Sequence, residues 1–95
     1  MAGTTDDKLM DIWDHYGPQA QAKQLVEEAY ELAEAINEVR SGEAQGTEHI
    51  TEEVADVLVL IDQVCVAFGI DLDYVQFTKN QKVVRTLTRI ESEEA

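Results

Sequence analysis

Cysteine, long apolar runs and secretion features are scarce in this sequence, and each scarcity excludes a class of protein. The single cysteine, Cys65, rules out an intrachain disulfide framework and a cysteine-based zinc site. Asp62 interrupts the best apolar stretch, Val57–Phe68, and a membrane-spanning helix needs about 20 apolar residues. Residues Met1–Asp7 lack the basic and apolar regions of a secretion signal. We therefore expect no membrane partner and a cytoplasmic location.

Basic residues are also few, since seven Lys and Arg stand against 20 Asp and Glu, giving a net charge of −13. Such a chain does not neutralise the phosphates of DNA, so we expect no duplex nucleic acid as a partner. The apolar content of 44% argues against a disordered acidic tail. Residues 1–70 carry 15 acids and 3 bases, whereas residues 71–90 carry 2 acids and 4 bases. An acidic body followed by a basic helix suggests that the protein binds cations and anions together. The alternative is that the negative charge only keeps the protein soluble or reflects a salty habitat.

Helix breakers are rare, because the chain has five glycines and one proline. Between them, apolar residues recur at the three- and four-residue spacing of amphipathic helices, and no segment is a credible strand. Gly17 and Pro18 separate two helices, and the segment Ser41–Thr47 (SGEAQGT) has the composition of a loop. The predicted helices are Asp6–Tyr16, residues 18–40, a segment from Thr51 (or Thr47 or Glu48) to Phe68, and a segment from Asp71 or Asp73 to about Ile90.

The length of 95 residues indicates one all-α domain, residues 1–95, with a thin core of its own. A chain of this size buries only roughly 60–70% of its unfolded surface. Residues 57–68 are nevertheless apolar on nearly every side, as in a buried helix. We therefore expect a hairpin of long antiparallel helices, with a short N-terminal and a basic C-terminal helix, that forms a four-helix-bundle core with a second subunit. The protein is then a homodimer or a dimer of dimers.

Two pairs of acids lie beside the apolar seams of the two central helices. Glu28 and Glu31 project along one flank of the second helix, and Glu53 and Asp56 repeat the three-residue spacing on the third. Asp56 stands among apolar neighbours, an unfavourable place for an unpaired carboxylate. Two antiparallel helices can point all four groups into one pocket, where oxygen-only ligands suit Mg²⁺ or Mn²⁺. The competing interpretation is a solvated face, because single acidic pairs at this spacing are common on helices.

Two glutamines, Gln21 and Gln24, lie on the same flank as Glu28, two turns and one turn before it. They can read the edge of a nucleotide base, so we count them as candidate substrate-binding residues. His49 lies at the edge of the predicted loop, and we expect no partner for it.

Longer segments around these acids resemble the MazG-like all-α NTP pyrophosphohydrolases, in the manner of small phage-type members. The motif E27-E28-x-x-E31 followed by E53-x-x-D56 is the family's acidic signature. The similarity covers about residues 10–90, and it also includes HYG at 15–17, LVEEAYELAEAI at 25–36, EEVADVLVLIDQV at 52–64 and KVVRTLTRI at 82–90.

The resemblance implies hydrolysis of nucleoside or deoxynucleoside triphosphates to the monophosphate and pyrophosphate. It implies Mg²⁺ ligation by Glu28, Glu31, Glu53 and Asp56. We expect Glu27 or Glu52 to act in the outer shell or to orient water. A phage protein of this kind acts in the host cytoplasm. One departure is that Asn80 follows Lys79 directly, where many members have a wider lysine–asparagine–arginine arrangement.

The basic side chains of the last helix are candidates for contact with the triphosphate: Lys79, Lys82, Arg85 and Arg89. Arginine binds phosphate oxygens through two parallel hydrogen bonds. The other interpretation is that these bases pair with the acidic body or with a neighbouring subunit. A second function class stays open as well, namely a non-catalytic acidic interaction module that is antitoxin-like or mimics nucleic acid. Such a mimic needs exposed carboxylates all round rather than carboxylates beside a core seam.

Overall fold

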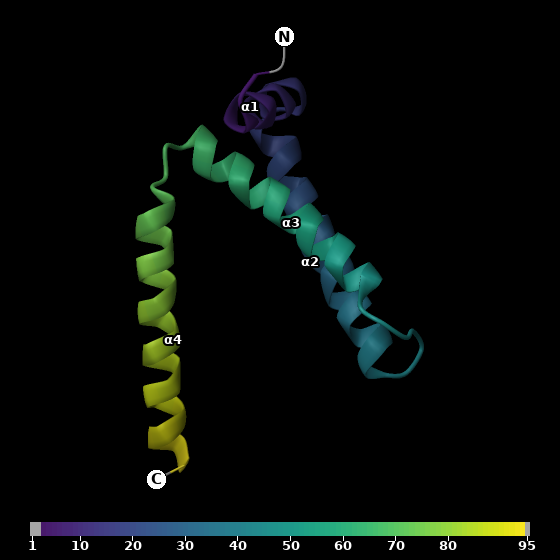
Figure 1. Cartoon of the computed structure of the whole chain (residues 1–95), viewed down its shortest axis with the longest axis vertical. Coiled ribbons are helices and arrows are strands. Elements are labelled where there is room, and N and C mark those ends of the chain that lie inside the picture. Colours follow the sequence, from purple (N-terminus) through teal and green to yellow (C-terminus); the bar gives the residue numbers. More distant parts are fainter. Residues whose placement is uncertain (1–2, 95) are drawn as a thin grey trace.

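A computed structural model describes residues 3–94, and these residues form four helices joined by short connections (Figure 1). The helices are α1 (Thr5–Tyr16), α2 (Pro18–Arg40), α3 (Glu48–Ala67) and α4 (Leu72–Glu94). The all-α prediction is confirmed, as is the loop between α2 and α3. The third helix begins at Glu48, one of the three starts considered, and the fourth continues past the expected end near Ile90.

Local sequence signals explain where the first helices begin and end. The Thr4 hydroxyl accepts a hydrogen bond from the Asp7 N–H at 3.1 Å, and the Asp7 carboxylate accepts one from the Thr4 N–H at 3.2 Å. This capping box satisfies two of the free amides at the start of α1. Gly17 has a φ of 90°, a conformation that favours glycine, and it turns the chain between α1 and α2. Pro18 then occupies the first turn of α2, where its missing N–H is harmless.

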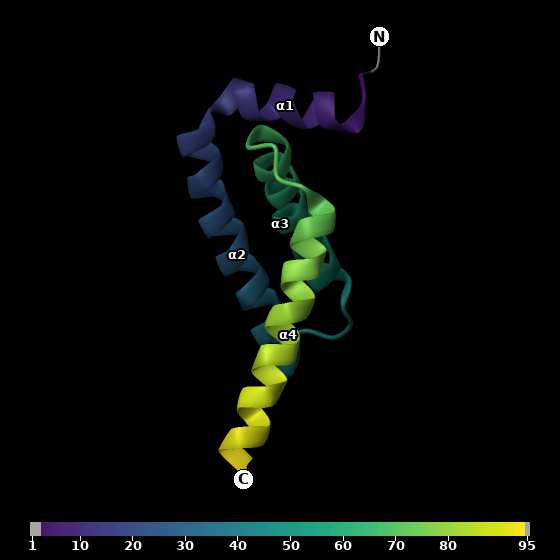
Figure 2. The ribbon, with the colours of Figure 1, turned by 90° about the vertical axis from the view of Figure 1, so that its left-hand side faces the viewer.

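The two long helices α2 and α3 form an antiparallel hairpin, and α1 lies across its open end (Figure 2). Their shared core is small, with Ala35, Leu60 and Cys65 as its buried apolar side chains among the described residues. Trp13 of α1 meets Phe68 edge to face, with ring centroids 6.1 Å apart. The hairpin therefore places the flank of α2 that carries Glu28 beside the first half of α3.

Helix α4 diverges from the hairpin (Figure 1), and every one of its residues except Thr78 is exposed. Because α4 does not fold back, the apolar half of α3 is only partly covered within one chain. Leu58 retains 50% of its accessible surface and Ile61 retains 41%. This partial exposure agrees with a single chain that has too few elements to surround the helix, and the second subunit that is expected to cover it remains a prediction. None of the helices in residues 3–94 is long and apolar enough to cross a membrane.

Candidate metal centre

Three carboxylates from two helices meet on one side of the hairpin. Glu28 of α2 and Glu53 and Asp56 of α3 each offer an oxygen, and these oxygens lie within 4.8 Å of one another. The three-residue spacing of Glu53 and Asp56 puts both on one face of α3. The antiparallel packing of α2 then brings Glu28 against that face. The predicted convergence of acids from the two helices is therefore present for these three side chains.

The three carboxylates differ in burial, and the order is not the expected one. Glu53 keeps only 8% of its accessible surface, Glu28 is half-buried, and Asp56 is exposed. The expectation that Asp56 is the most enclosed acid is wrong. Its apolar neighbours Val54 and Leu58 are themselves exposed in the single chain, so they do not enclose it.

Two oxygens of this cluster are buried and have no hydrogen-bond partner within the described chain, namely Oε2 of Glu28 and Oε2 of Glu53. Burying a charged oxygen without a partner is unfavourable, and such atoms are rare in folded proteins. Glu28 and Glu53 would hold a cation, and the cation would supply the partner that these oxygens lack. Hard divalent ions prefer carboxylate oxygens, so the donor set fits Mg²⁺ or Mn²⁺.

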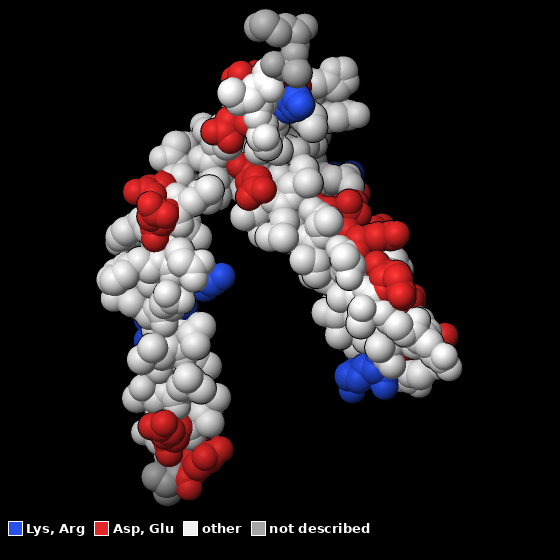
Figure 3. All heavy atoms as spheres, in the orientation of Figure 1, with Lys and Arg blue, Asp and Glu red and all other residues white. Residues whose placement is uncertain are grey.

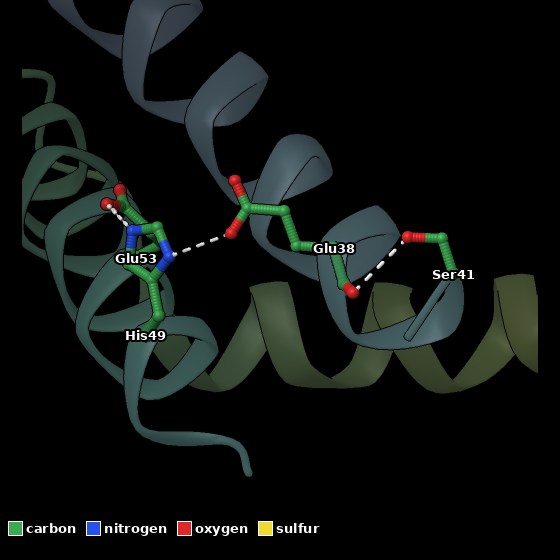
Figure 4. Close-up of polar contacts among 4 residues, drawn as sticks. All are labelled: Glu38, Ser41, His49 and Glu53. Atoms are coloured by element: carbon green, nitrogen blue, oxygen red, sulfur yellow. Dashed lines mark hydrogen bonds and ion pairs between the residues drawn. The ribbon is translucent and has the colours of Figure 1, made fainter. Parts of the chain in front are cut away.

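The other oxygen of each of these two carboxylates, Glu28 and Glu53, has a partner one helical turn earlier. Gln24 Nε2 donates to Glu28 Oε1 at 2.8 Å, and His49 Nε2 lies 3.2 Å from Glu53 Oε1. The second ring nitrogen of His49 lies 3.5 Å from Glu38 Oε2 on α2 (Figure 4). The expectation that His49 has no partner is wrong. Its four-residue spacing to Glu53 is the sequence signal that reveals the contact.

Burial raises the pKa of the Glu53 carboxyl above its ordinary value of 4.5. The negative charge of Glu31 raises that pKa further, as does the adjacent carboxylate of Glu28, whereas the contact with His49 lowers it. Glu53 thus resists ionisation in the absence of a cation. A bound divalent ion reverses this preference, because it favours the charged form of every carboxylate that it contacts.

A family model for the MazG nucleotide pyrophosphohydrolase domain matches residues 16–88 of the chain. The chain belongs to this family. The resemblance that the acidic motifs indicate is therefore confirmed. No curated protein and no solved structure matches the chain. The matched part of the MazG domain contains the three clustered carboxylates and ends one residue before Arg89.

Two further acids of the MazG domain lie near the cluster without completing it. Glu31 is exposed and is not among the three side chains whose oxygens converge, although its charge acts on Glu53. Glu27 is exposed as well. Their roles as a ligand and as an outer-shell residue stay predictions.

The predicted substrate-binding residues of the MazG domain fall into two groups. Gln21 is buried, and its Nε2 donates to Gln63 Oε1 at 2.8 Å, so that nitrogen is engaged within the core. The Nε2 of Gln24 likewise donates a hydrogen bond to Glu28. The four bases of α4 are exposed, and α4 stands apart from the acidic arm of α2 and α3 (Figure 3): Lys79, Lys82, Arg85 and Arg89. One chain alone does not bring these bases to the carboxylates.

Proposed function

We propose that the protein is a Mg²⁺-dependent pyrophosphohydrolase that converts nucleoside or deoxynucleoside triphosphates to the monophosphate and pyrophosphate. The observation that carries the proposal is the pair of buried, unpartnered oxygens of Glu28 and Glu53 within a three-carboxylate cluster of a MazG domain. Mn²⁺ is the alternative ion, because it accepts the same oxygen donors.

Glu28, Glu53 and Asp56 are the proposed ligands, joined by Glu31 from the next turn of α2. When bound, Mg²⁺ supplies positive charge beside the phosphate oxygens and makes water a stronger nucleophile at neutral pH. The buried position of Glu53 keeps one ligand out of bulk water, and exposed Asp56 leaves the centre open to solvent and substrate. Glu27 is exposed, and we propose that it orients the attacking water or acts in the outer shell.

Hydrolysis then cleaves the bridge between the α- and β-phosphates, with the elements of water added across it. Lys79, Lys82, Arg85 and Arg89 are the proposed contacts of the phosphate oxygens. Because α4 lies away from the carboxylates in one chain, this role requires that a second copy bring a basic helix to the acidic arm. The sequence predicts that Gln21 and Gln24 read the nucleotide base, but their amide nitrogens bind Gln63 and Glu28, so these side chains are better suited to shaping the site.

Assembly into a homodimer or a dimer of dimers is the second part of the proposal. Large apolar side chains on α3, directly after it and on α4 remain exposed in one chain, among them Leu58, Phe68, Phe77 and Leu87. Monomeric soluble proteins rarely expose so many apolar groups together. Residues 1–70 are strongly acidic and residues 71–90 are slightly basic, so the charge on two copies favours contact between the hairpin of one and α4 of the other.

A panel of NTPs and dNTPs, assayed for pyrophosphate with Mg²⁺ and with EDTA, tests the activity. We expect release with Mg²⁺ and none with EDTA. Asp56→Asn is expected to lose the activity, and Asp62→Asn, an equally exposed acid farther along α3, is the matched control that retains it. If no triphosphate yields pyrophosphate under any metal condition, the non-catalytic interaction module becomes the better account.

A further inference from the structure

We propose that Gln24 and His49 are positioning residues of the metal centre. Each holds one oxygen of the carboxylate four residues later on its own helix, so that the other oxygen faces the ion. The inference rests on the proposed metal site and adds two residues outside the acidic signature.

The two contacts repeat one arrangement on two helices. Gln24 Nε2 donates to Glu28 Oε1 on α2, and His49 Nε2 approaches Glu53 Oε1 on α3, at 2.8 and 3.2 Å. In both glutamates, Oε2 is the buried oxygen without a partner. Residues four apart lie one above the other on a helix, so each donor reaches its glutamate without help from the rest of the fold. In each glutamate, a neighbouring side chain holds one oxygen, and the other oxygen is left free for the ion. A preformed metal site requires this arrangement.

Positioning matters here because Glu28 and Glu53 repel each other before an ion arrives. A glutamate has several rotatable bonds, and an untied carboxylate would turn away from a neighbouring charge toward water. A hydrogen bond to one oxygen opposes that movement. Partners of this kind, which orient the ligands of a metal, commonly change its affinity by about 10- to 100-fold when they are removed.

His49 is itself held in place from the opposite helix. Its Nδ1 lies 3.5 Å from Glu38 Oε2, so the imidazole stands between a carboxylate of α2 and a carboxylate of α3 (Figure 4). Both partners are carboxylates, and a carboxylate only accepts hydrogen bonds, so the nitrogen facing each one serves as a donor when it carries a proton. His49 is not among the side chains whose donor atoms converge at the cluster. It therefore acts on the ion through Glu53 and not as a ligand.

Direct titration of the full-length protein with Mn²⁺ alone, followed by the electron paramagnetic resonance signal of the free ion, tests the inference without nucleotide or turnover. We expect His49→Leu and Gln24→Leu each to weaken Mn²⁺ binding about tenfold or more. His49→Gln is expected to bind within about twofold of the wild type, because Gln24 shows that glutamine at this spacing reaches a glutamate.

Two matched controls replace a histidine and a glutamine at other positions in the chain. His15→Leu replaces the other histidine, and Gln76→Leu breaks a glutamine contact to Asn80 at the same four-residue spacing on α4. Both are expected to bind Mn²⁺ like the wild type. The side chain of His49 is 52% exposed, so its replacement leaves the core intact, and thermal melts of all variants verify this.

The outcomes separate the inference from the proposed function. A wild-type protein that binds no Mn²⁺ overturns the metal centre and the positioning residues together. A wild type that binds Mn²⁺, with either leucine variant binding equally well, overturns the positioning role and leaves the metal centre standing. Failure of His49→Gln to restore binding also overturns it, because the donor would then not be what matters.

Discussion

Gln21 and Gln63 form a buried hydrogen bond across the α2–α3 seam, from Nε2 of the first to Oε1 of the second at 2.8 Å. Gln63 keeps 1% of its accessible surface and Gln21 keeps 8%. The pair joins the two helices through a buried hydrogen bond, which opposes sliding of one helix along the other. Since this alignment of the helices brings Glu28 against Glu53, this amide pair supports the geometry of the carboxylate cluster.

Removal of one amide of this pair is expected to destabilise the fold. Gln21→Leu or Gln63→Leu leaves the other amide buried without its partner, at a cost of about 1–3 kcal/mol of unfolding free energy. The double variant is expected to recover most of that loss, because two apolar side chains can pack against each other. Urea unfolding of the four proteins in EDTA measures this coupling. Losses that simply add in the double variant would show that the two amides do not depend on each other.

The raised pKa of Glu53 predicts how the metal-free protein responds to pH. A carboxyl whose pKa is higher in the folded state loses its proton more readily in the unfolded chain. The stability of the metal-free fold is therefore expected to fall as the pH rises from about 4.5 through the raised folded-state pKa of Glu53, and to level off above it. Thermal melts in EDTA across this range measure the effect.

The variant Glu53→Gln isolates that contribution, because an amide carries no charge at any pH. In EDTA at pH 7 it is expected to melt at the wild-type temperature or a few degrees above it, with the difference shrinking below about pH 4.5. Asp62→Asn, an exposed carboxylate on the same helix, is the control and is expected to follow the wild type. A Glu53→Gln protein that melts well below the wild type at pH 7 would mean that the charge of Glu53 stabilises the apo fold.

Mg²⁺ is expected to stabilise the wild type and scarcely Asp56→Asn. An ion that binds only the folded state raises stability with its concentration, by about 2.7 kcal/mol at 100 times the dissociation constant. Because Asp56 is exposed, its amidation is expected to leave the melting temperature in EDTA nearly unchanged. Paired melts with EDTA and with Mg²⁺ check both statements. An equal gain from Mg²⁺ in both proteins would remove Asp56 from the ligand set.

Light scattering at micromolar concentration is expected to give a mass of at least twice 10.6 kDa. Charge placed in the exposed apolar surface, as in Leu58→Glu or Phe77→Glu, is expected to shift the protein toward the monomer. A well-folded monomer of the wild type at this concentration contradicts the predicted assembly.

Much of the fold follows from the sequence, because its signals are local. The turn at Gly17 and Pro18, the loop at 41–47 and the helical periods depend on neighbouring residues, and all are present in the structure. The convergence of Glu28, Glu53 and Asp56 also follows from their spacing once two helices are taken as antiparallel.

The parts that sequence reasoning missed depend on rotation and contact between helices. The rotation of α3 about its own axis decides whether Glu53 or Asp56 faces the seam. The pattern of apolar residues does not determine this rotation closely enough to distinguish the two. The Gln21–Gln63 bond joins residues 42 positions apart, so no local spacing reveals it. The departure of α4 from the hairpin likewise depends on contacts between helices, which local spacing does not reveal.

The most direct test of the central account is a phosphorus NMR spectrum of the reaction products. With Mg²⁺ and a triphosphate that the protein accepts, the account predicts equal amounts of nucleoside monophosphate and pyrophosphate. It predicts unchanged triphosphate with EDTA, or when Glu53→Gln replaces the wild type. Products that appear as nucleoside diphosphate and orthophosphate, or pyrophosphate release that EDTA does not affect, would contradict a metal-dependent pyrophosphohydrolase built on Glu28, Glu53 and Asp56.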